Sequence, residues 1–140
     1  MDEFLKRENR FIVVGATANR EKWGNRVLRR LHDLGFWVVG LNPKYKEIEG
    51  LWCFSDLEIA KEAVMGDGWP GTSGGEIVVV TVVPPEAVEA VLMACSEQGI
   101  KRVWMQPGSE SEVAVALAKK LKIATVQACI VVDGLGEKWE

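Results

Sequence analysis

The stretch FIVVGAT, residues 11–17, constrains the fold of this chain more than any other part of the sequence. Its first four residues are apolar and mostly β-branched, which indicates a strand buried on both faces. Gly15 stands where such a strand must turn sharply, and residues 22–34 then repeat apolar side chains at helical spacing. A strand, a glycine turn and a helix N-terminus together form an anion site, because backbone N–H groups and the positive end of the helix dipole point at one place. The stretch therefore predicts a site for a phosphorylated ligand.

The rest of the chain alternates between strand and helix in the same way. Apolar runs between turn signals predict strands at residues 10–14, 36–41, 51–54, 76–83 and 101–105, with one or two more within 123–132. Helical periodicity and capping residues predict helices at 22–34, 55–65, 86–98 and 109–121. Such alternation favours right-handed crossovers and a parallel sheet. We therefore expect an α/β fold, a Rossmann-like open parallel sheet with helices on both faces.

The connecting segments are expected to be irregular. Residues 2–9 read as a short helix or arm, and residues 44–50 as a loop. Residues 66–75 hold five glycines and a proline, which is too many helix and strand breakers for either element and predicts a surface loop. The expected organisation is one domain over residues 1–140 with a glycine-rich loop at 66–75.

Composition excludes several classes of protein. A chain of 140 residues that is 48% hydrophobic can bury one core. Its longest apolar run, residues 77–85, falls far short of the ~18 to 20 residues of a membrane span, and the N-terminus lacks the core of a signal peptide. The net charge of −3, without a dense basic stripe, argues against a nucleic-acid partner. We expect a cytoplasmic protein that binds neither membrane nor nucleic acid.

Neither a metal site nor a catalytic set is predicted. Cys53, Cys95 and Cys129 lie far apart, and with His32 as the one histidine they do not form metal-ligand spacing. They are expected to be reduced thiols. His32 falls inside the predicted helix 22–34, away from every strand end, so a serine or cysteine nucleophile has no base beside it. We therefore expect a binding protein rather than an enzyme.

The strand ends indicate which nucleotides the site can hold. After Gly15 the chain reads ATANR, which lacks the second and third glycines of the GxGxxG fingerprint of NAD sites. At the end of the second strand, where NAD enzymes usually carry an acidic residue for the ribose, the chain has Asn42-Pro43-Lys44. A lysine there favours a phosphate on the ribose. NADP and coenzyme A both carry one, so these residues leave both ligands open.

Taken together and in order, these motifs resemble the small CoA-binding domain proteins, single-domain relatives of the CoA-binding domain of the succinyl-CoA synthetase alpha subunit. The resemblance covers residues 10–132. The segments that carry it are VGAT at 14–17, KWG at 22–24, GF at 35–36, LNP at 41–43, SDL at 55–57, VP at 83–84 and VWMQPG at 103–108. Near the end of the chain the residues around Cys129 depart from the family pattern, which leaves that end without an assigned chemistry.

The resemblance implies a role for each matched position. Gly15-Ala16-Thr17 would lie against the CoA diphosphate, with Lys22 as a counter-charge. Asn42-Pro43-Lys44 would flank the adenosine, Lys44 reaching the ribose phosphate. Val83-Pro84 would form an apolar wall for the adenine. Gln106-Pro107-Gly108 would line the pantetheine side of the groove.

The expected function is therefore non-catalytic binding of coenzyme A or an acyl-CoA, a small-molecule nucleotide ligand. Two alternatives stay open. One is an NADP-dependent oxidoreductase, which would need a hydride acceptor site. The other is an interaction subunit with a vestigial nucleotide site, which would dock to a protein partner. A homo-oligomer or a protein partner is compatible with each of these functions.

Overall fold

The computed structural model describes residues 3–65 and 75–135, and a seven-stranded sheet forms the centre of this part of the chain. The strand order across the sheet is β3-β4-β2-β1-β5-β6-β7. The strands are β1 (Arg10–Val14), β2 (Trp37–Leu41), β3 (Glu47–Ile48), β4 (Leu51–Phe54), β5 (Ile77–Thr81), β6 (Arg102–Met105) and β7 (Ala124–Gln127). Neighbouring strands are parallel except β3 and β4, which form an antiparallel hairpin at one edge.

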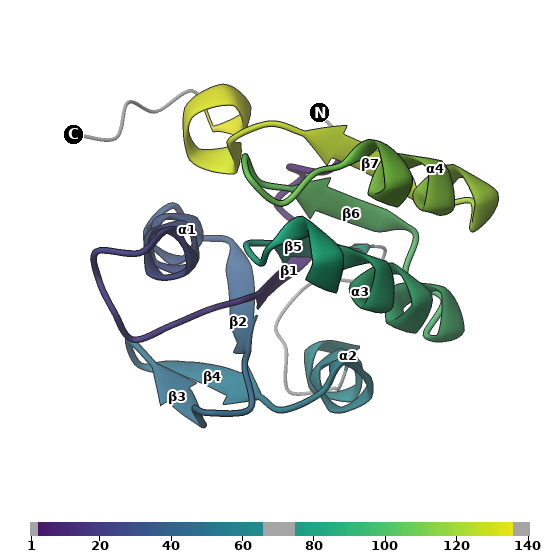
Figure 1. Cartoon of the computed structure of the whole chain (residues 1–140). Helices are drawn as coiled ribbons and strands as arrows, with labels where there is room; N and C mark the ends of the chain where they lie inside the picture. The colour runs from purple at the N-terminus through teal and green to yellow at the C-terminus, as the bar shows by residue number, and fades with distance from the viewer. Residues whose placement is uncertain (1–2, 66–74, 136–140) are drawn as a thin grey trace.

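Helices cover both faces of this sheet (Figure 1). They are α1 (Trp23–Asp33), α2 (Leu57–Met65), α3 (Pro85–Glu97), α4 (Glu112–Lys120) and the short π-helix η1 (Ile130–Gly134). One hydrophobic cluster joins α2, α3 and α4 to the sheet, and a second joins α1 and η1 to the opposite face. The predicted Rossmann-like α/β fold with helices on both faces is confirmed.

The alternation of side chains along β1 explains why both faces need covering. Ile12 and Val14 belong to the cluster under α2, α3 and α4, whereas Phe11 and Val13 belong to the cluster under α1. All four are buried. A strand that is apolar on both sides is stable only at the centre of a covered sheet, which is where β1 lies.

Two predicted segments were wrong in part. Residues 44–50 are not entirely loop, because Glu47–Ile48 pairs with Leu51 and Trp52 as β3 of the edge hairpin. Residues 123–132 are not strand throughout, because β7 ends at Gln127 and η1 begins at Ile130. The turn into η1 is made by contacts to distant and local side chains: Ile130 donates its N–H to Gln106 Oε1 at 2.6 Å, and Cys129 donates its N–H to Asp133 Oδ2 at 2.9 Å.

The N-terminal segment is an arm rather than a helix over its described residues 3–9. Phe4 is 5% exposed and packs edge to face on Trp104, with ring centroids 5.9 Å apart. The arm thus covers the hydrophobic cluster beside η1, because Trp104 and Ile130 both belong to that cluster. The predicted glycine-rich loop lies, except for Gly75, outside the described residues.

Candidate ligand-binding groove

A groove of ≈ 630 Å³ opens at the carboxyl ends of β1, β2 and β5. From β1 the chain winds to β2 on one side and the sheet continues to β5 on the other, so this is the topological switch point, where ligands bind in open α/β sheets. The groove is lined by Gly15, Thr17, Glu21, Lys22, Trp23, Gly24, Asn42, Lys44, Val82, Val83 and Pro84. These residues come from the strand ends and the helix start that the sequence pointed to.

Gly15 directly follows β1 and has a φ of +97°, a conformation that favours glycine. A Cβ atom at this position would lie 2.7 Å from the carbonyl oxygen of Val82 and 3.0 Å from Cγ1 of Val83. The backbone N–H of Gly15 donates to the carbonyl of Leu41 at 3.2 Å. The turn therefore fits tightly between the ends of β2 and β5, and a larger residue would displace it.

Gly24, in the first turn of α1, allows the helix to approach the glycine turn. A Cβ atom on Gly24 would lie 2.1 Å from the carbonyl oxygen of Gly15 and 3.4 Å from Cα of Ala16. Close packing of this kind is the role of the third glycine in GxGxxG sites. The fingerprint itself is absent, but its packing glycine has a counterpart nine positions after Gly15 (24 − 15).

Two asparagine side chains hold the carbonyl groups of the turn. Asn42 Nδ2 donates to the carbonyl of Ala16 at 2.9 Å, and Asn25 Nδ2 donates to the carbonyl of Thr17 at 2.9 Å. In a trans peptide the C=O and the N–H that follows it point in opposite directions. The N–H groups of Thr17 and Ala18 therefore point away from the two asparagines.

The turn presents hydrogen-bond donors to an oxygen atom beside it. The Tyr45 hydroxyl lies 3.3 Å from the hydroxyl of Thr17, which also accepts from the N–H of Asn19 at 3.2 Å. The hydrogen bond with Thr17, together with the backbone N–H of Ala18, lowers the pKa of Tyr45. The Thr17 hydroxyl and the N–H of Ala18 are thus donors directed at the Tyr45 oxygen.

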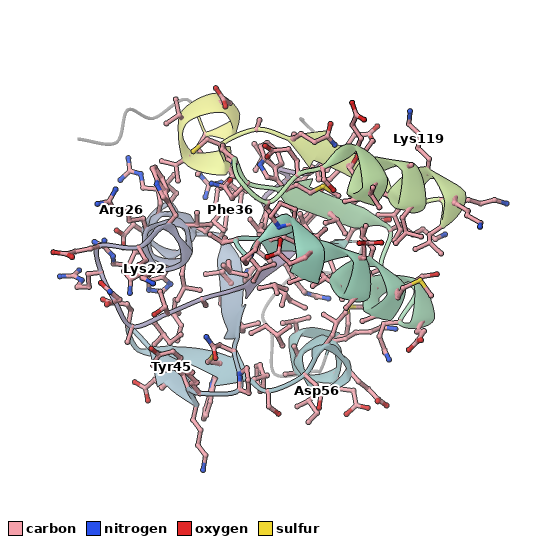
Figure 2. All side chains as sticks on the ribbon, in the orientation of Figure 1. Lys22, Arg26, Phe36, Tyr45, Asp56 and Lys119 are labelled. Carbon is pink, nitrogen blue, oxygen red and sulfur yellow. The ribbon has the colours of Figure 1, made fainter. Side chains whose placement is uncertain are left out.

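Positive charge lies on the same side of the molecule. Lys22 and Lys44 are exposed and line the groove together with one acidic residue, Glu21. Lys22 occupies the N-cap position of α1, where the helix dipole favours anions. Figure 2 shows Lys22 and Arg26 at α1 and Tyr45 near β3 and β4, far from Lys119 on α4. The charged lining of the groove favours a negatively charged ligand.

A second pocket, of ≈ 290 Å³, lies beside the groove toward the end of β6. Trp23 and Val82 line both spaces, so they form the junction between them. The second pocket is lined by Trp23, Val82, Gln106, Pro107, Cys129, Val132 and Asp133. Together the two spaces make an elongated site with lysines at one end and mostly apolar walls at the other.

Gln106 fixes the wall of the second pocket. It is 2% exposed, and its Oε1 accepts the N–H of Ile130 at 2.6 Å while its Nε2 lies 3.7 Å from Cys129 Sγ. Cys129 is half-buried, whereas Cys53 and Cys95 are buried. Burial raises the pKa of Cys95 to about 12 and also raises that of Cys53. Cys129 is therefore the cysteine that faces the site.

The structure brings most of the predicted site residues together. Seven line the groove: Gly15, Thr17, Lys22, Asn42, Lys44, Val83 and Pro84. Gln106 and Pro107 line the second pocket. Ala16, Pro43 and Gly108 line neither space: Ala16 is buried beneath the turn, whereas Pro43 and Gly108 are exposed beside the lining residues. Contact with a ligand stays a prediction for all twelve.

Sequence reasoning placed Val82 at a strand end of the site but gave no role there to Trp23, Asn25 and Tyr45. Trp23 is 39% exposed, and the guanidinium carbon of Arg26 lies 5.3 Å from the centroid of its ring. A large aromatic residue left exposed at the start of a helix was the available signal for Trp23. Asn25 is fully buried, and its helical position on the apolar face of α1 was a comparable signal.

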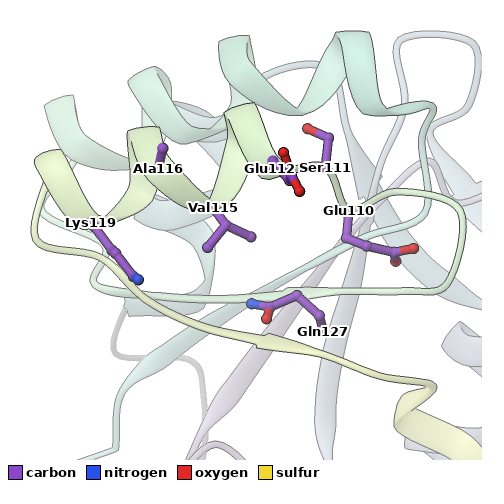
Figure 3. A pocket seen from close by; sticks show the side chains of 7 residues that line it. All are labelled: Glu110, Ser111, Glu112, Val115, Ala116, Lys119 and Gln127. Atoms are coloured by element: carbon purple, nitrogen blue, oxygen red, sulfur yellow. The ribbon is translucent and has the colours of Figure 1, made fainter.

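A third pocket, of ≈ 570 Å³, lies elsewhere and holds none of the predicted residues (Figure 3). It runs between α4 and β7, the edge strand of the sheet, and is lined by Glu110, Ser111, Glu112, Val115, Ala116, Lys119 and Gln127. Its lining carries two acidic residues and one lysine. It lacks the glycine turn and the strand-end geometry of the groove, so we assign the candidate site to the groove.

Residues 3–65 and 75–135 contain no cluster of three or more His, Cys, Asp or Glu side chains that could hold a metal ion. In the same part of the chain, no helix is both long enough and apolar enough to cross a membrane.

Comparisons with known proteins identify the family of this chain. Residues 9–134 match the family model of the CoA binding domain. The chain is 27% identical over 101 residues to an ADP-forming acetate–CoA ligase of Methanocaldococcus jannaschii. That match covers 72% of this chain and 13% of the ligase, so the chain spans a small part of the length of that enzyme.

Solved structures of similar proteins share the fold. A conserved hypothetical protein from Pyrococcus furiosus superposes with a TM-score of 0.73 at 33% identity, covering 89% of this chain and 98% of that one. A hypothetical protein from Pyrococcus horikoshii OT3 superposes with a TM-score of 0.73 at 25% identity, covering 91% and 82%. The resemblance read from the ordered motifs is confirmed by the family match over nearly the whole chain, and this chain belongs to the CoA-binding domain family.

Proposed function

We propose that the groove and the second pocket together bind coenzyme A or an acyl-CoA. The observation that carries this proposal is that the two spaces share Trp23 and Val82 as lining residues and therefore lie side by side. One space is lined by lysines and the other mostly by apolar side chains. Coenzyme A has a matching division into an anionic nucleotide and a neutral pantetheine arm.

The diphosphate would lie against the glycine turn. The N–H of Gly15 is used by Leu41, so the donors proposed here are the N–H groups of Ala16 and Thr17 and the Thr17 hydroxyl. The Thr17 hydroxyl accepts from the N–H of Asn19, and its own proton, which is donated to Tyr45 in the ligand-free protein, would turn to a phosphate oxygen. The ammonium group of Lys22 would add a counter-charge.

The adenosine would lie between the ends of β2 and β5. Asn42 holds the backbone of Lys44 through a hydrogen bond of 2.9 Å from the Lys44 N–H to Asn42 Oδ1. This places the lysine at the groove, where it would reach the ribose 3′-phosphate. Val83 and Pro84 would pack against the adenine ring, and Pro43 would flank it from the β2 side.

The pantetheine arm would enter the second pocket along Gln106 and Pro107, with Gly108 beside its mouth. The walls contributed by Trp23 and Val82 suit its methyl and methylene groups. NADP would have to place a ribose, a phosphate and a charged ring there instead. The apolar lining therefore favours CoA over NADP.

Isothermal titration with CoA, dephospho-CoA and NADP tests the proposal. We expect micromolar binding of CoA, about 8 kcal/mol, and weak binding of NADP. Lys44→Ala should raise the dissociation constant of CoA about tenfold, because it removes one charge-assisted contact to the 3′-phosphate. Dephospho-CoA, which lacks that phosphate, should bind the variant and the unmodified protein equally.

Other outcomes would select the alternatives. NADP that binds more tightly than CoA would favour an oxidoreductase. If none of the ligands binds, native mass spectrometry should first test for a retained ligand, and a protein without one would favour an interaction subunit with a vestigial site. That binding is the whole function stays a prediction, which the absence of acetyl-CoA turnover over hours of incubation would support.

A further inference from the structure

Glu49 occupies a turn position that favours glycine or asparagine. With Gly50 it joins β3 to β4 in a two-residue hairpin turn, and the two residues have φ values of 54° and 79°. Hairpin turns with positive φ at both central residues favour Asn-Gly, because a residue with a longer side chain is crowded in the left-handed region. Glutamate is therefore a poor choice for the turn itself, and the contacts of its carboxylate suggest another role.

The Glu49 carboxylate contacts the segment that connects the glycine turn to α1. Its Oε2 lies 3.3 Å from Nε of Arg20 and accepts a hydrogen bond from Nδ2 of Asn25 at 3.2 Å. The Glu49 side chain is only 26% exposed, so water screens these contacts incompletely. One oxygen atom thus ties the hairpin both to the loop after Gly15 and to the first turn of α1.

Asn25 connects the Glu49 carboxylate to the glycine turn through hydrogen bonds. Its side chain is fully buried, and the same Nδ2 that donates to Glu49 also donates to the carbonyl of Thr17 at 2.9 Å. Its Oδ1 accepts from Nε of Arg29 at 2.6 Å, which fixes the orientation of the amide. Arg29 also donates to the carbonyl of Arg20 at 3.4 Å. The loop is therefore held at Thr17 and Arg20 by a network that ends on Glu49.

We propose that Glu49 is a positioning residue for the phosphate site, and that the β3–β4 hairpin holds residues 16–22 in their binding shape. The inference rests on the proposed function, because the ligand that benefits is the diphosphate of CoA. Residues 16–22 contain no glycine and belong to neither strand nor helix, so without the network they would sample other conformations. A loop that is ordered before binding loses less entropy when the ligand arrives.

Two simpler roles for Glu49 predict different results. If its charge mattered only through space, removing this anion from the β3–β4 turn would strengthen the binding of an anionic ligand. If it served only the hairpin, glycine at this left-handed position would leave binding unchanged and the turn no less stable. Positioning predicts weaker binding in a variant whose hairpin remains folded.

The experiment compares Glu49→Gly, Glu49→Gln and Glu47→Gln. We expect Glu49→Gly to weaken CoA about fivefold to tenfold in isothermal titration while its urea midpoint stays at or above that of the unmodified protein. Glu49→Gln keeps an oxygen for Asn25 and should stay within about twofold. Glu47→Gln removes the same charge from exposed β3 and should also stay within about twofold. Tighter or unchanged CoA binding by Glu49→Gly would overturn the proposal.

Hydrogen exchange of the ligand-free proteins separates this inference from the proposed function. In Glu49→Gly the amides of residues 16–22 should exchange faster, with those of β1 and β5 unchanged. If the unmodified protein does not bind CoA, the proposed function fails, and exchange alone decides whether Glu49 positions the loop. Equal loop exchange in both proteins, or faster exchange throughout the sheet, would refute the positioning role.

Discussion

The two halves of the elongated site differ in their lining: one combines a loop with two lysines, and the other is mostly apolar. The half at the glycine turn is a loop whose carbonyl groups are held by asparagine side chains, with Lys22 and Lys44 at its rim. The half at β6 has a mostly apolar wall, in which the buried Gln106, directly after β6, accepts the N–H of Ile130 in η1. Anion recognition needs exposed backbone N–H groups, which regular elements use up internally, whereas a neutral arm needs only a shaped apolar wall. The comparison therefore predicts that the two halves respond differently to substitution, salt and chemical labelling.

Gly24→Ala should have the largest effect, because its Cβ would lie 2.1 Å from the carbonyl oxygen of Gly15, a backbone atom that cannot rotate away as a flexible side chain could. We expect a loss of about 3 kcal/mol in the free energy of unfolding, and CoA binding below detection, as α1 is pushed off the turn. Urea denaturation and isothermal titration measure the two quantities. Gly50→Asn is the control, because its Cβ meets nothing within 4 Å and asparagine tolerates positive φ. Normal CoA binding by Gly24→Ala would refute the close packing.

Gln106→Leu should act on the other half. It removes the acceptor of the Ile130 N–H and leaves that buried donor without its partner, which costs about 2 kcal/mol in the free energy of unfolding. The wall that faces the pantetheine arm should become less ordered, so CoA should bind more weakly. Adenosine 3′,5′-bisphosphate lacks the arm and should bind as before. Titration with CoA and with this fragment measures the separation. If the fragment loses as much affinity as CoA, the two halves are not independent.

Salt should distinguish the halves without any substitution. Raising NaCl from about 50 mM to about 500 mM shortens the Debye length severalfold and should weaken adenosine 3′,5′-bisphosphate about fivefold, because its contacts are charged. Pantetheine is uncharged, so its dissociation constant, obtained by competition against CoA, should scarcely change with salt. The measurement is a competition titration at the two salt concentrations. An equal response of both fragments would contradict the division of the site into charged and apolar halves.

Cysteine labelling should report the smallest effect. At pH ~8 iodoacetamide should modify Cys129 first, because burial shields Cys53 and Cys95 and raises the pKa of Cys95 to about 12. Saturating CoA should slow the labelling of Cys129 a few-fold, since Cys129 lines the second pocket. Peptide mass spectrometry over time measures both rates. Labelling of Cys129 that is indifferent to CoA would place the pantetheine arm elsewhere.

Local pattern was sufficient for every strand except β3 and for helices α1 to α4. The apolar run at β1 and the periodic face of α1 each lie within one element, so burial could be read without knowing the partner. The short β3 could not be read this way, because two residues have no periodicity and their pairing with β4 defines them. The apolar composition of residues 130–132 also suits a strand, and only Gln106 and Asp133 show why the chain turns there.

The α/β class, the glycine turn and the strand ends at which a ligand would sit can be derived from the amino-acid sequence, because they follow from hydrophobicity and backbone conformation within short segments. The packing of Gly24 on Gly15, the hydrogen bonds of Asn25 and Glu49 at the turn, and the sharing of Trp23 and Val82 by the two pockets arise only from the folded arrangement. Each of these depends on the distance between residues that belong to different elements. The hydrophobic periodicity of the sequence does not indicate these distances, because they are set only when the sheet forms.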